Sequence, residues 1–195
     1  AGSVKLVSHL LDERFLVIQG DTYTEIDLSG AVKAHIKSGC DATIVVKSVP
    51  NPWLFGLVEC DDKGFIIGFK EKPKPDECRS NKVSTGIYVL EPDVLDFITQ
   101  YPCDFAKNIF PRMLASGKKL LAYEGEGFWV DVGSREGYIE AQKRILRRHM
   151  EEYATPIWLL GEAYIGKEAK VEAPVLIGSE VIVEDGATIG PYASI

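Results

Sequence analysis

The sequence predicts an α/β domain with a mixed sheet, followed by a short parallel β-helix. From Phe15 to about residue 150, short apolar runs typical of strands alternate with amphipathic helical patterns, which favours helices layered on a sheet. After a linker at about 151–157, aliphatic residues instead recur every six positions, a period that no helix gives. We therefore expect one domain over residues 1–153 and a second over residues 157–195.

The start of the first domain shows a strand, a helix and a second strand. Residues 15–19 begin with four consecutive apolar residues, a run typical of a strand buried on both faces. Asp27 is expected to cap a helix that begins near Leu28, and Gly39 is expected to end it. Four of residues 42–46 are β-branched, and the run is expected to form the next strand.

A β-hairpin is predicted between residues 54–60 and residues 65–70. The four residues between these runs include Asp61, Asp62 and Gly64, which favour a tight turn. A hairpin places two antiparallel strands in the sheet, so the sheet is expected to be mixed.

The rest of the domain contains one more long strand and three helices. Residues 83–90 are strand-like, Pro92 is expected to open a helix, and Asp104 is expected to cap another helix that Pro111 should break or kink. After a final strand-like run at residues 128–132, Ser134 is expected to cap a long helix.

The second domain is defined by a strict six-residue repeat. A parallel β-helix of triangular section takes six residues per face, with one aliphatic side chain of each face pointing inward. The expected inward residues are Leu159, Ile165, Val171, Ile177, Val183, Ile189 and Ile195. Two coils leave apolar coil ends open, so we expect the helix to continue beyond these residues or to pack against another copy in a homo-oligomer.

Composition excludes several classes of protein. A net charge of -7 argues against nucleic-acid binding, which depends on clustered Lys and Arg. The sequence contains no apolar run of about 20 residues and no signal-peptide pattern, so we expect no membrane association and a cytoplasmic location. The four cysteines show no CxxC pair and are expected to be reduced thiols: Cys40, Cys60, Cys78 and Cys103. His9, His35 and His149 lack partner spacing and are interpreted as structural or surface residues.

Two aspartates stand where a cation could be held. Asp21 directly follows a strand, and Asp131 ends the later run 128–130 in the same way. In α/β sheets, ligands bind beyond the carboxyl ends of strands. Two carboxylates there could hold Mg²⁺, which takes few protein oxygens and keeps positions for water and phosphate. Taken singly, each aspartate is more simply interpreted as a turn or cap residue.

Four ordered motifs carry a resemblance to a known family: Gln19-Gly20-Asp21, Glu71-Lys72-Pro73, Thr85-Gly86-Ile87-Tyr88-Val89 and Trp129-Val130-Asp131-Val132-Gly133. With the C-terminal repeat, the chain resembles the sugar-phosphate nucleotidyltransferases, and among them the mannose-1-phosphate guanylyltransferase-like proteins. That resemblance implies a Rossmann-like catalytic domain, a left-handed β-helix, and transfer of a nucleotidyl group from a nucleoside triphosphate to a sugar 1-phosphate.

The resemblance also implies roles for single residues. Asp21 and Asp131 would be the Mg²⁺ ligands, and Lys72 would bind the phosphate of the sugar 1-phosphate. Glu71 and Gly56 would contact the sugar. Thr85 and Gly86 stand where the family binds its sugar substrate.

Two departures from the family pattern affect these expectations. The family has Asn-Ala-Gly or Asn-Thr-Gly where this chain has Ser84-Thr85-Gly86. The glycine-rich Gly-x-Gly-Thr-Arg loop, whose amides cradle the triphosphate, has no counterpart in this sequence. We expect that loop and the first strands of the domain to lie outside this chain, and this chain alone to be inactive.

Two other functions stay open. Hexapeptide helices also build acyltransferase sites, although residues 155–195 contain no histidine to act as a base. A non-catalytic regulatory relative is the other alternative. Asp21, Lys72 and Asp131 argue against it, because a scaffold has no physical need for a metal pair and a phosphate-binding cation.

Overall fold

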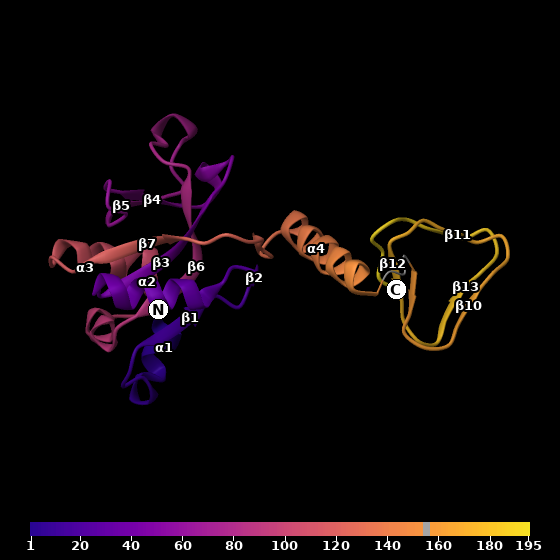
Figure 1. Cartoon of the computed structure of the whole chain (residues 1–195), viewed down its shortest axis with the longest axis horizontal. Helices are drawn as coiled ribbons and strands as arrows, with labels where there is room; N and C mark the ends of the chain where they lie inside the picture. Colours follow the sequence, from indigo (N-terminus) through magenta and orange to yellow (C-terminus); the bar gives the residue numbers. More distant parts are fainter. Residues whose placement is uncertain (154–156) are drawn as a thin grey trace. The chain divides into compact units, whose positions relative to one another are not determined.

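The computed structural model describes residues 1–153 and 157–195, so part of the linker expected at 151–157 lies outside the described residues. Within these ranges, side-chain surroundings are described for all residues except 146, 149–153, 157 and 158, and the interpretation of His149 falls outside them. The chain divides into two compact units, Ala1–Trp129 and Val130–Ile195 (Figure 1). No helix in the described part has the length and apolar character needed to cross a membrane.

The first unit combines one sheet with short helices. Its helices are α1 (Gly2–Leu6), α2 (Leu28–Ser38) and α3 (Phe110–Ala115), with short turns η1 (Ser8–Leu10), η2 (Pro52–Leu54), η3 (Pro75–Glu77), η4 (Pro92–Phe97) and η5 (Phe105–Ile109). Its strands are β1 (Phe15–Ile18), β2 (Thr22–Thr24), β3 (Ala42–Ser48), β4 (Gly56–Cys60), β5 (Ile66–Glu71), β6 (Lys82–Leu90) and β7 (Leu120–Glu124). Strand β8 (Trp129–Asp131) follows.

The main sheet is mixed, as the sequence predicts. Its order is β5-β4-β6-β3-β7, with β1 also paired to β6. Only β3 and β7 run parallel to each other, and the other pairs are antiparallel. The predicted hairpin is confirmed as β4 and β5, and the Asp61 carboxylate accepts hydrogen bonds from the backbone of Lys63 and Phe65 in its turn.

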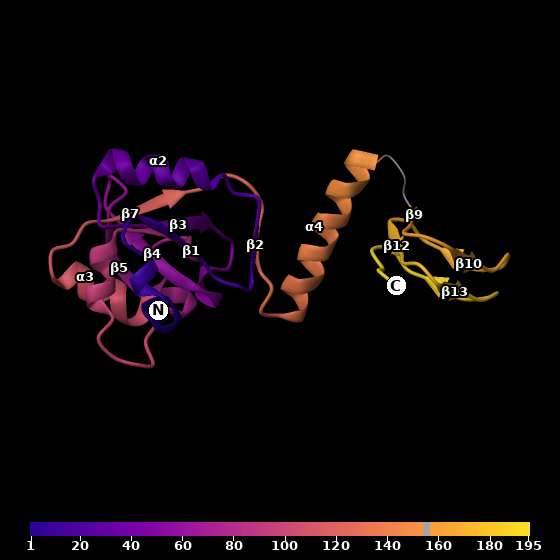
Figure 2. The same ribbon diagram turned by 90° about the horizontal axis from the view of Figure 1, so that it is seen from below.

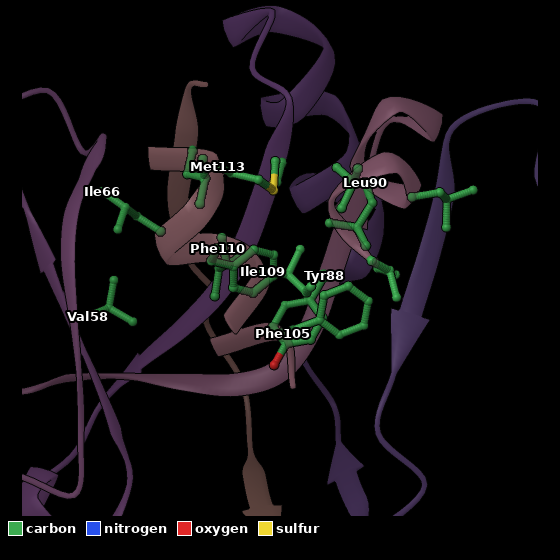
Figure 3. Close-up of a cluster of buried hydrophobic side chains, with 14 of the residues drawn as sticks. Val58, Ile66, Tyr88, Leu90, Phe105, Ile109, Phe110 and Met113 are labelled. Atoms are coloured by element: carbon green, nitrogen blue, oxygen red, sulfur yellow. The ribbon is translucent and has the colours of Figure 1, made fainter. Parts of the chain in front are cut away.

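Helices cover both faces of this sheet, with α2 on one face and α3 on the other (Figure 2). Alternate residues of β3 point to opposite faces, so Ile44 joins the core beneath α3 while Val45 joins the core beneath α2. Figure 3 shows the larger core, in which Phe110 of α3 packs against Tyr88 of β6 and Phe105 of η5, with ring centroids 5.0 and 5.5 Å away.

The helix predicted after Asp27 is confirmed at both ends. The Asp27 carboxylate accepts the backbone N–H of Ser29, and Gly39 ends α2 in the left-handed conformation at φ 59°.

Strand β1 differs from the expectation of burial on both faces. It pairs with β6 along one edge, and none of the described strands pairs with its other edge. Leu16 and Ile18, which point to the same face of the sheet, are 40% and 46% exposed. A continuous apolar run predicts a strand, but its burial depends on which strands and helices pack beside it.

The segment between Pro92 and Ala115 also departs from prediction. Pro92 opens a short 3-10 turn, η4, rather than an α-helix. Asp104 caps the next helical segment as predicted, since its carboxylate accepts the N–H of Lys107 at 2.9 Å. The segment changes from the π-helical turn η5 to an α-helix at Phe110, and Pro111 lies in the first turn of α3, where a proline is tolerated.

The second unit contains α4 (Arg135–Tyr153) and short strands. Ser134 caps α4 as predicted, because its hydroxyl accepts the N–H of Gly137 at 3.0 Å. The strands are β9 (Ile157–Leu159), β10 (Ala163–Ile165), β11 (Lys170–Val171), β12 (Val175–Ile177), β13 (Val181–Val183) and β14 (Thr188–Ile189).

These strands pair in parallel with partners three hexads further along the chain. Leu159 lies opposite Ile177, Ile165 opposite Val183, and Val171 opposite Ile189. Of the predicted inward residues, Ile177 and Val183 are buried, whereas Leu159 and Ile195, at the two ends of the repeat, are 52% and 44% exposed. The paired strands trace the sides of a triangular outline in Figure 1.

A buried polar network fastens α2 to the sheet. His35 of α2 is 1% exposed, and its ring lies 2.9 Å from the Thr43 hydroxyl and 3.0 Å from the Glu91 carboxylate. Cys40, one of four free cysteines, has its Sγ 3.3 Å from His35 Nδ1. Arg14 pairs with Glu91 on the solvent side. The interpretation of His35 as a structural residue is confirmed.

This network affects the protonation of His35. Burial opposes the charged ring, but hydrogen bonds to Cys40 and Glu91 outweigh burial and raise the pKa of His35 above 6.5. The stabilisation from protonated His35 is therefore fully present below pH 6.5 and is lost as the pH rises through the raised pKa.

We predict that H35Q lowers the free energy of unfolding by about 2 kcal/mol at about pH 6, because two buried hydrogen bonds are lost. The difference between wild type and variant should shrink by about pH 8.5, because protonated His35 no longer contributes. Urea unfolding at both pH values measures the difference in free energy of unfolding between wild type and H35Q. A difference that grows with pH would contradict the prediction.

Candidate functional site

The centre of the candidate site is an irregularity in the longest strand, β6. Between the pairs Ile44–Tyr88 and Val46–Ser84, three residues of β6 lie opposite the single residue Val45. Gly86 takes φ 76° within this bulge. Bulges of this kind are common next to functional sites, because they redirect the chain out of the regular ladder.

The bulge holds the Gln19-Gly20-Asp21 segment. The N–H of Gln19 donates to the Gly86 carbonyl at 3.1 Å. A Cβ at position 86 would lie 2.0 Å from Gln19 Oε1, so the side chain of Gln19 occupies the space that only glycine leaves free. Asp21 is the last residue of this segment and is exposed.

The bulge also holds the start of the Trp129 motif. The indole N–H of Trp129 donates to the Thr85 carbonyl at 3.0 Å. The Thr85 side chain is buried, and its hydroxyl donates to the Val45 carbonyl at 2.8 Å. Thr85 is therefore a structural junction whose hydroxyl is already used, and any contact it makes with a substrate would come from its backbone.

The remaining motif, Glu71-Lys72-Pro73, is linked to Trp129 through Phe55. The Phe55 and Trp129 rings lie 5.6 Å apart in an edge arrangement, and the N–H of Lys72 donates to the Phe55 carbonyl at 3.1 Å. Segments of all four motifs, far apart in the sequence, are thus joined through direct contacts within Ala1–Trp129.

Lys72 has a strained backbone. Its φ of 44° lies in the left-handed region, which costs a residue with a Cβ about 1 kcal/mol or more. Pro73 is buried directly after it and the Lys72 side chain is exposed. Such strain is common where a side chain must point in a functional direction.

Glu71 and Gly56 line one pocket of about 210 Å³. They are opposite residues of β5 and β4, and a Cβ at position 56 would lie 3.2 Å from Glu71 Oε2. The absence of a side chain at Gly56 therefore leaves room for the Glu71 carboxylate. The pocket is lined by Gly56, Leu57, Phe69, Lys70, Glu71, Ser84, Ala106, Lys107 and Pro111.

Sequence reasoning missed two charged residues of this pocket, Lys70 and Lys107. Lys107 of η5 places its ammonium 3.3 Å from Glu71 Oε1. Residues 71 and 107 belong to no common motif, and nothing in the sequence pattern pairs them. Lys72, which follows Glu71, does not line this pocket.

Asp21 and Asp131 offer carboxylate oxygens, the ligand type that suits Mg²⁺. Asp131 Oδ1 accepts the N–H of Gly133 at 2.9 Å, which orients the carboxylate. Among the described residues there is no cluster of three or more His, Cys, Asp or Glu side chains around a possible cation. A donor set of few carboxylates fits Mg²⁺, which keeps several waters and binds phosphate oxygens. That both aspartates hold one cation stays a prediction.

Comparisons with known proteins agree with the resemblance carried by the motifs. The chain is 34% identical over 206 residues to a UTP--glucose-1-phosphate uridylyltransferase of Synechocystis sp., covering 98% of this chain and 53% of the relative. It is 35% identical over 188 residues to a probable mannose-1-phosphate guanylyltransferase 2 of Oryza sativa subsp. japonica, covering 91% of this chain and 51% of the relative. The chain spans about half the length of the curated relatives it matches.

A solved structure matches the fold. It is a putative glucose-1-phosphate thymidylyltransferase from Bacillus anthracis, with a TM-score of 0.63 and 26% identity over 72% of this chain and 58% of that chain. The mixed α/β arrangement is therefore the Rossmann-like fold of these enzymes. Residues 1–148 match the family described as nucleotidyl transferase. With the match covering most of the chain, this protein belongs to the nucleotidyl transferase family.

Proposed function

We propose that the protein transfers a nucleotidyl group from a nucleoside triphosphate to a sugar 1-phosphate, in the manner of mannose-1-phosphate guanylyltransferases. The observation that carries the proposal is the joining of the four motif segments around the β6 bulge. That arrangement brings the strand end before Asp21 into contact with Gly86 and links Lys72 through Phe55 to Trp129. Relatives named for guanylyl and uridylyl transfer support the same reaction class.

The reaction needs no covalent intermediate with the protein. A phosphate oxygen of the sugar 1-phosphate attacks the α-phosphorus of the triphosphate, and the bond to pyrophosphate breaks. Catalysis then consists mainly of positioning two anionic reactants and offsetting their charge. Lys72, whose side chain is exposed, supplies a positive charge for the sugar phosphate.

Glu71 binds the sugar in this proposal. A carboxylate accepts hydrogen bonds only, so it suits the hydroxyl donors of a hexose ring. The pocket beside Gly56 leaves room for that ring, and both Gly56 and Glu71 are held in register by the β4–β5 ladder.

Asp21 and Asp131 would hold Mg²⁺ in the working enzyme. When bound, the cation offsets the charge of the phosphates and helps to align them. Asp131 is pre-oriented by the N–H of Gly133, and Asp21 follows the segment fixed to Gly86.

We also propose that the C-terminal strands form a left-handed parallel β-helix. The parallel pairing of residues three hexads apart supports a three-sided coil. The handedness is taken from the resemblance to hexapeptide-repeat proteins.

The first test is sugar-phosphate binding by this chain. We predict that the chain binds mannose 1-phosphate or glucose 1-phosphate and that K72M weakens binding by about tenfold or more, because a charge-assisted hydrogen bond is lost. Isothermal titration calorimetry measures it. K74M, which removes an exposed lysine two positions away, is the matched control and should bind like wild type. Equal losses in K72M and K74M would contradict the role of Lys72.

The second test separates strain from charge at position 72. K72G and K72A both remove the ammonium, so both should lose sugar-phosphate affinity. Because glycine adopts positive φ without strain, K72G should be more stable than K72A by about 1 kcal/mol in urea unfolding. Equal stability of the two variants would show that the backbone there carries no strain.

The third test concerns the cation and uses Mn²⁺ as a probe in place of Mg²⁺. We predict that D21N and D131N each weaken Mn²⁺ binding in the presence of the sugar 1-phosphate, because each removes a charged oxygen ligand. Electron paramagnetic resonance of free Mn²⁺ measures it. D62N, in the exposed hairpin turn, is the control. Unchanged Mn²⁺ binding in D21N and D131N would exclude both as ligands.

A further inference from the structure

The pocket that contains Glu71 has two differently built walls. One wall is sheet, from β4, β5 and β6, and the other is the helical segment of η5 and α3. On the sheet wall, Glu71 lies beside Gly56, with Oε2 3.2 Å from where a Cβ of residue 56 would be. On the helical wall, Lys107 is the only charged residue that lines the pocket.

The two walls are joined by an ion pair. Lys107 Nζ lies 3.3 Å from Glu71 Oε1, with the side chains 56% and 38% exposed. An ion pair this exposed contributes about 0–1 kcal/mol to folding, so stability gives little reason for it. Its geometric effect is larger, because one carboxylate oxygen is drawn to Lys107 while the other lies beside Gly56.

The backbone holds Lys107 firmly in this place. Its N–H is bonded to the Asp104 carboxylate at 2.9 Å, and the Asn108 side chain in turn accepts the N–H of Asp104 at 2.8 Å. Phe105 and Ile109, on either side, are buried in the core. The π-helical turn is therefore anchored at both its cap and its apolar residues, and it presents Lys107 from a fixed base.

We propose that Lys107 is a positioning residue for the sugar: it holds the Glu71 carboxylate beside Gly56 so that Glu71 accepts hydrogen bonds from hexose hydroxyls. The inference rests on the function proposed above and deepens it. Lys107 also offsets the charge of Glu71, which would otherwise repel an anionic substrate. Lys72 binds the phosphate and Lys107 acts through Glu71, so the two lysines serve different parts of one ligand.

The test compares a hexose 1-phosphate with inorganic phosphate by calorimetry at about 0.15 M salt, where charges more than about 8 Å apart are largely screened. K107M should lose about tenfold in affinity for mannose 1-phosphate or glucose 1-phosphate, and should bind inorganic phosphate like wild type. K72M should lose affinity for both ligands. K107R should keep most of the hexose 1-phosphate affinity, because it can still pair with Glu71.

K82M is the matched control for loss of an ion-paired lysine. Lys82 pairs with Glu124 at 2.8 Å, is 38% exposed and does not line the pocket. The K82M variant should bind both ligands like wild type. In an E71Q background, the effect of K107M should largely disappear, because Lys107 acts through the carboxylate that E71Q removes. Melting temperatures should show all variants folded.

The outcomes separate the inference from the function on which it rests. If wild type binds no hexose 1-phosphate, the proposed function fails and the inference fails with it. If wild type binds and K72M does not, but K107M binds like wild type, only the role of Lys107 is overturned. The role of Lys107 would also be overturned if K107M lost affinity for the hexose 1-phosphate and for inorganic phosphate equally. The same holds if K107M weakened hexose 1-phosphate binding as much in the E71Q background as it does in wild type.

Discussion

At Thr85 and Gly86 the central strand β6 leaves its regular ladder with β3, and the candidate site depends on that departure. The bulge leaves the Thr85 carbonyl to accept the indole N–H of Trp129, while the Gly86 carbonyl accepts the N–H of Gln19 and so extends the β1–β6 register by one pair. The same positive φ at Gly86 leaves the space filled by the Gln19 side chain. In a regular ladder with β3 the Thr85 carbonyl would be used by that strand, and Trp129 would lose its hydrogen bond to β6.

The features that could be predicted from the sequence are those set by local chemistry. The cap at Asp27, the left-handed stop at Gly39 and the hairpin after Asp61 each depend on a few adjacent residues. The six-residue repeat is also local, because each hexad carries its own inward residue. The structure pairs those hexads in parallel, Ile165 with Val183 for example, as the repeat requires.

The features that could not be predicted depend on residues distant in the sequence. The apolar run of β1 indicates a strand, but the exposure of Leu16 reflects which strands pack beside it. Pro111 lies in the first turn of α3 and a π turn precedes that helix, and nothing in the local composition specifies the π turn. The contact between Lys107 and Glu71 follows from that turn. Motifs indicated Glu71 and Lys72 as candidates, whereas the residues that lie beside them in space are set by the fold and could not be predicted.

Net charge imposes one further constraint on how this site can work. This chain, which spans about half the length of its curated relatives, carries a formal charge of -7, so its own net charge gives no attraction for the two anionic reactants of the proposed reaction. Attraction must then come from individual cations at the site, and a carboxylate that binds sugar hydroxyls there adds a negative charge that opposes it. Pairing Glu71 with Lys107 keeps its hydrogen-bonding capacity while cancelling its charge. Lys72 then remains available for the phosphate, since its charge is not consumed by the neighbouring carboxylate.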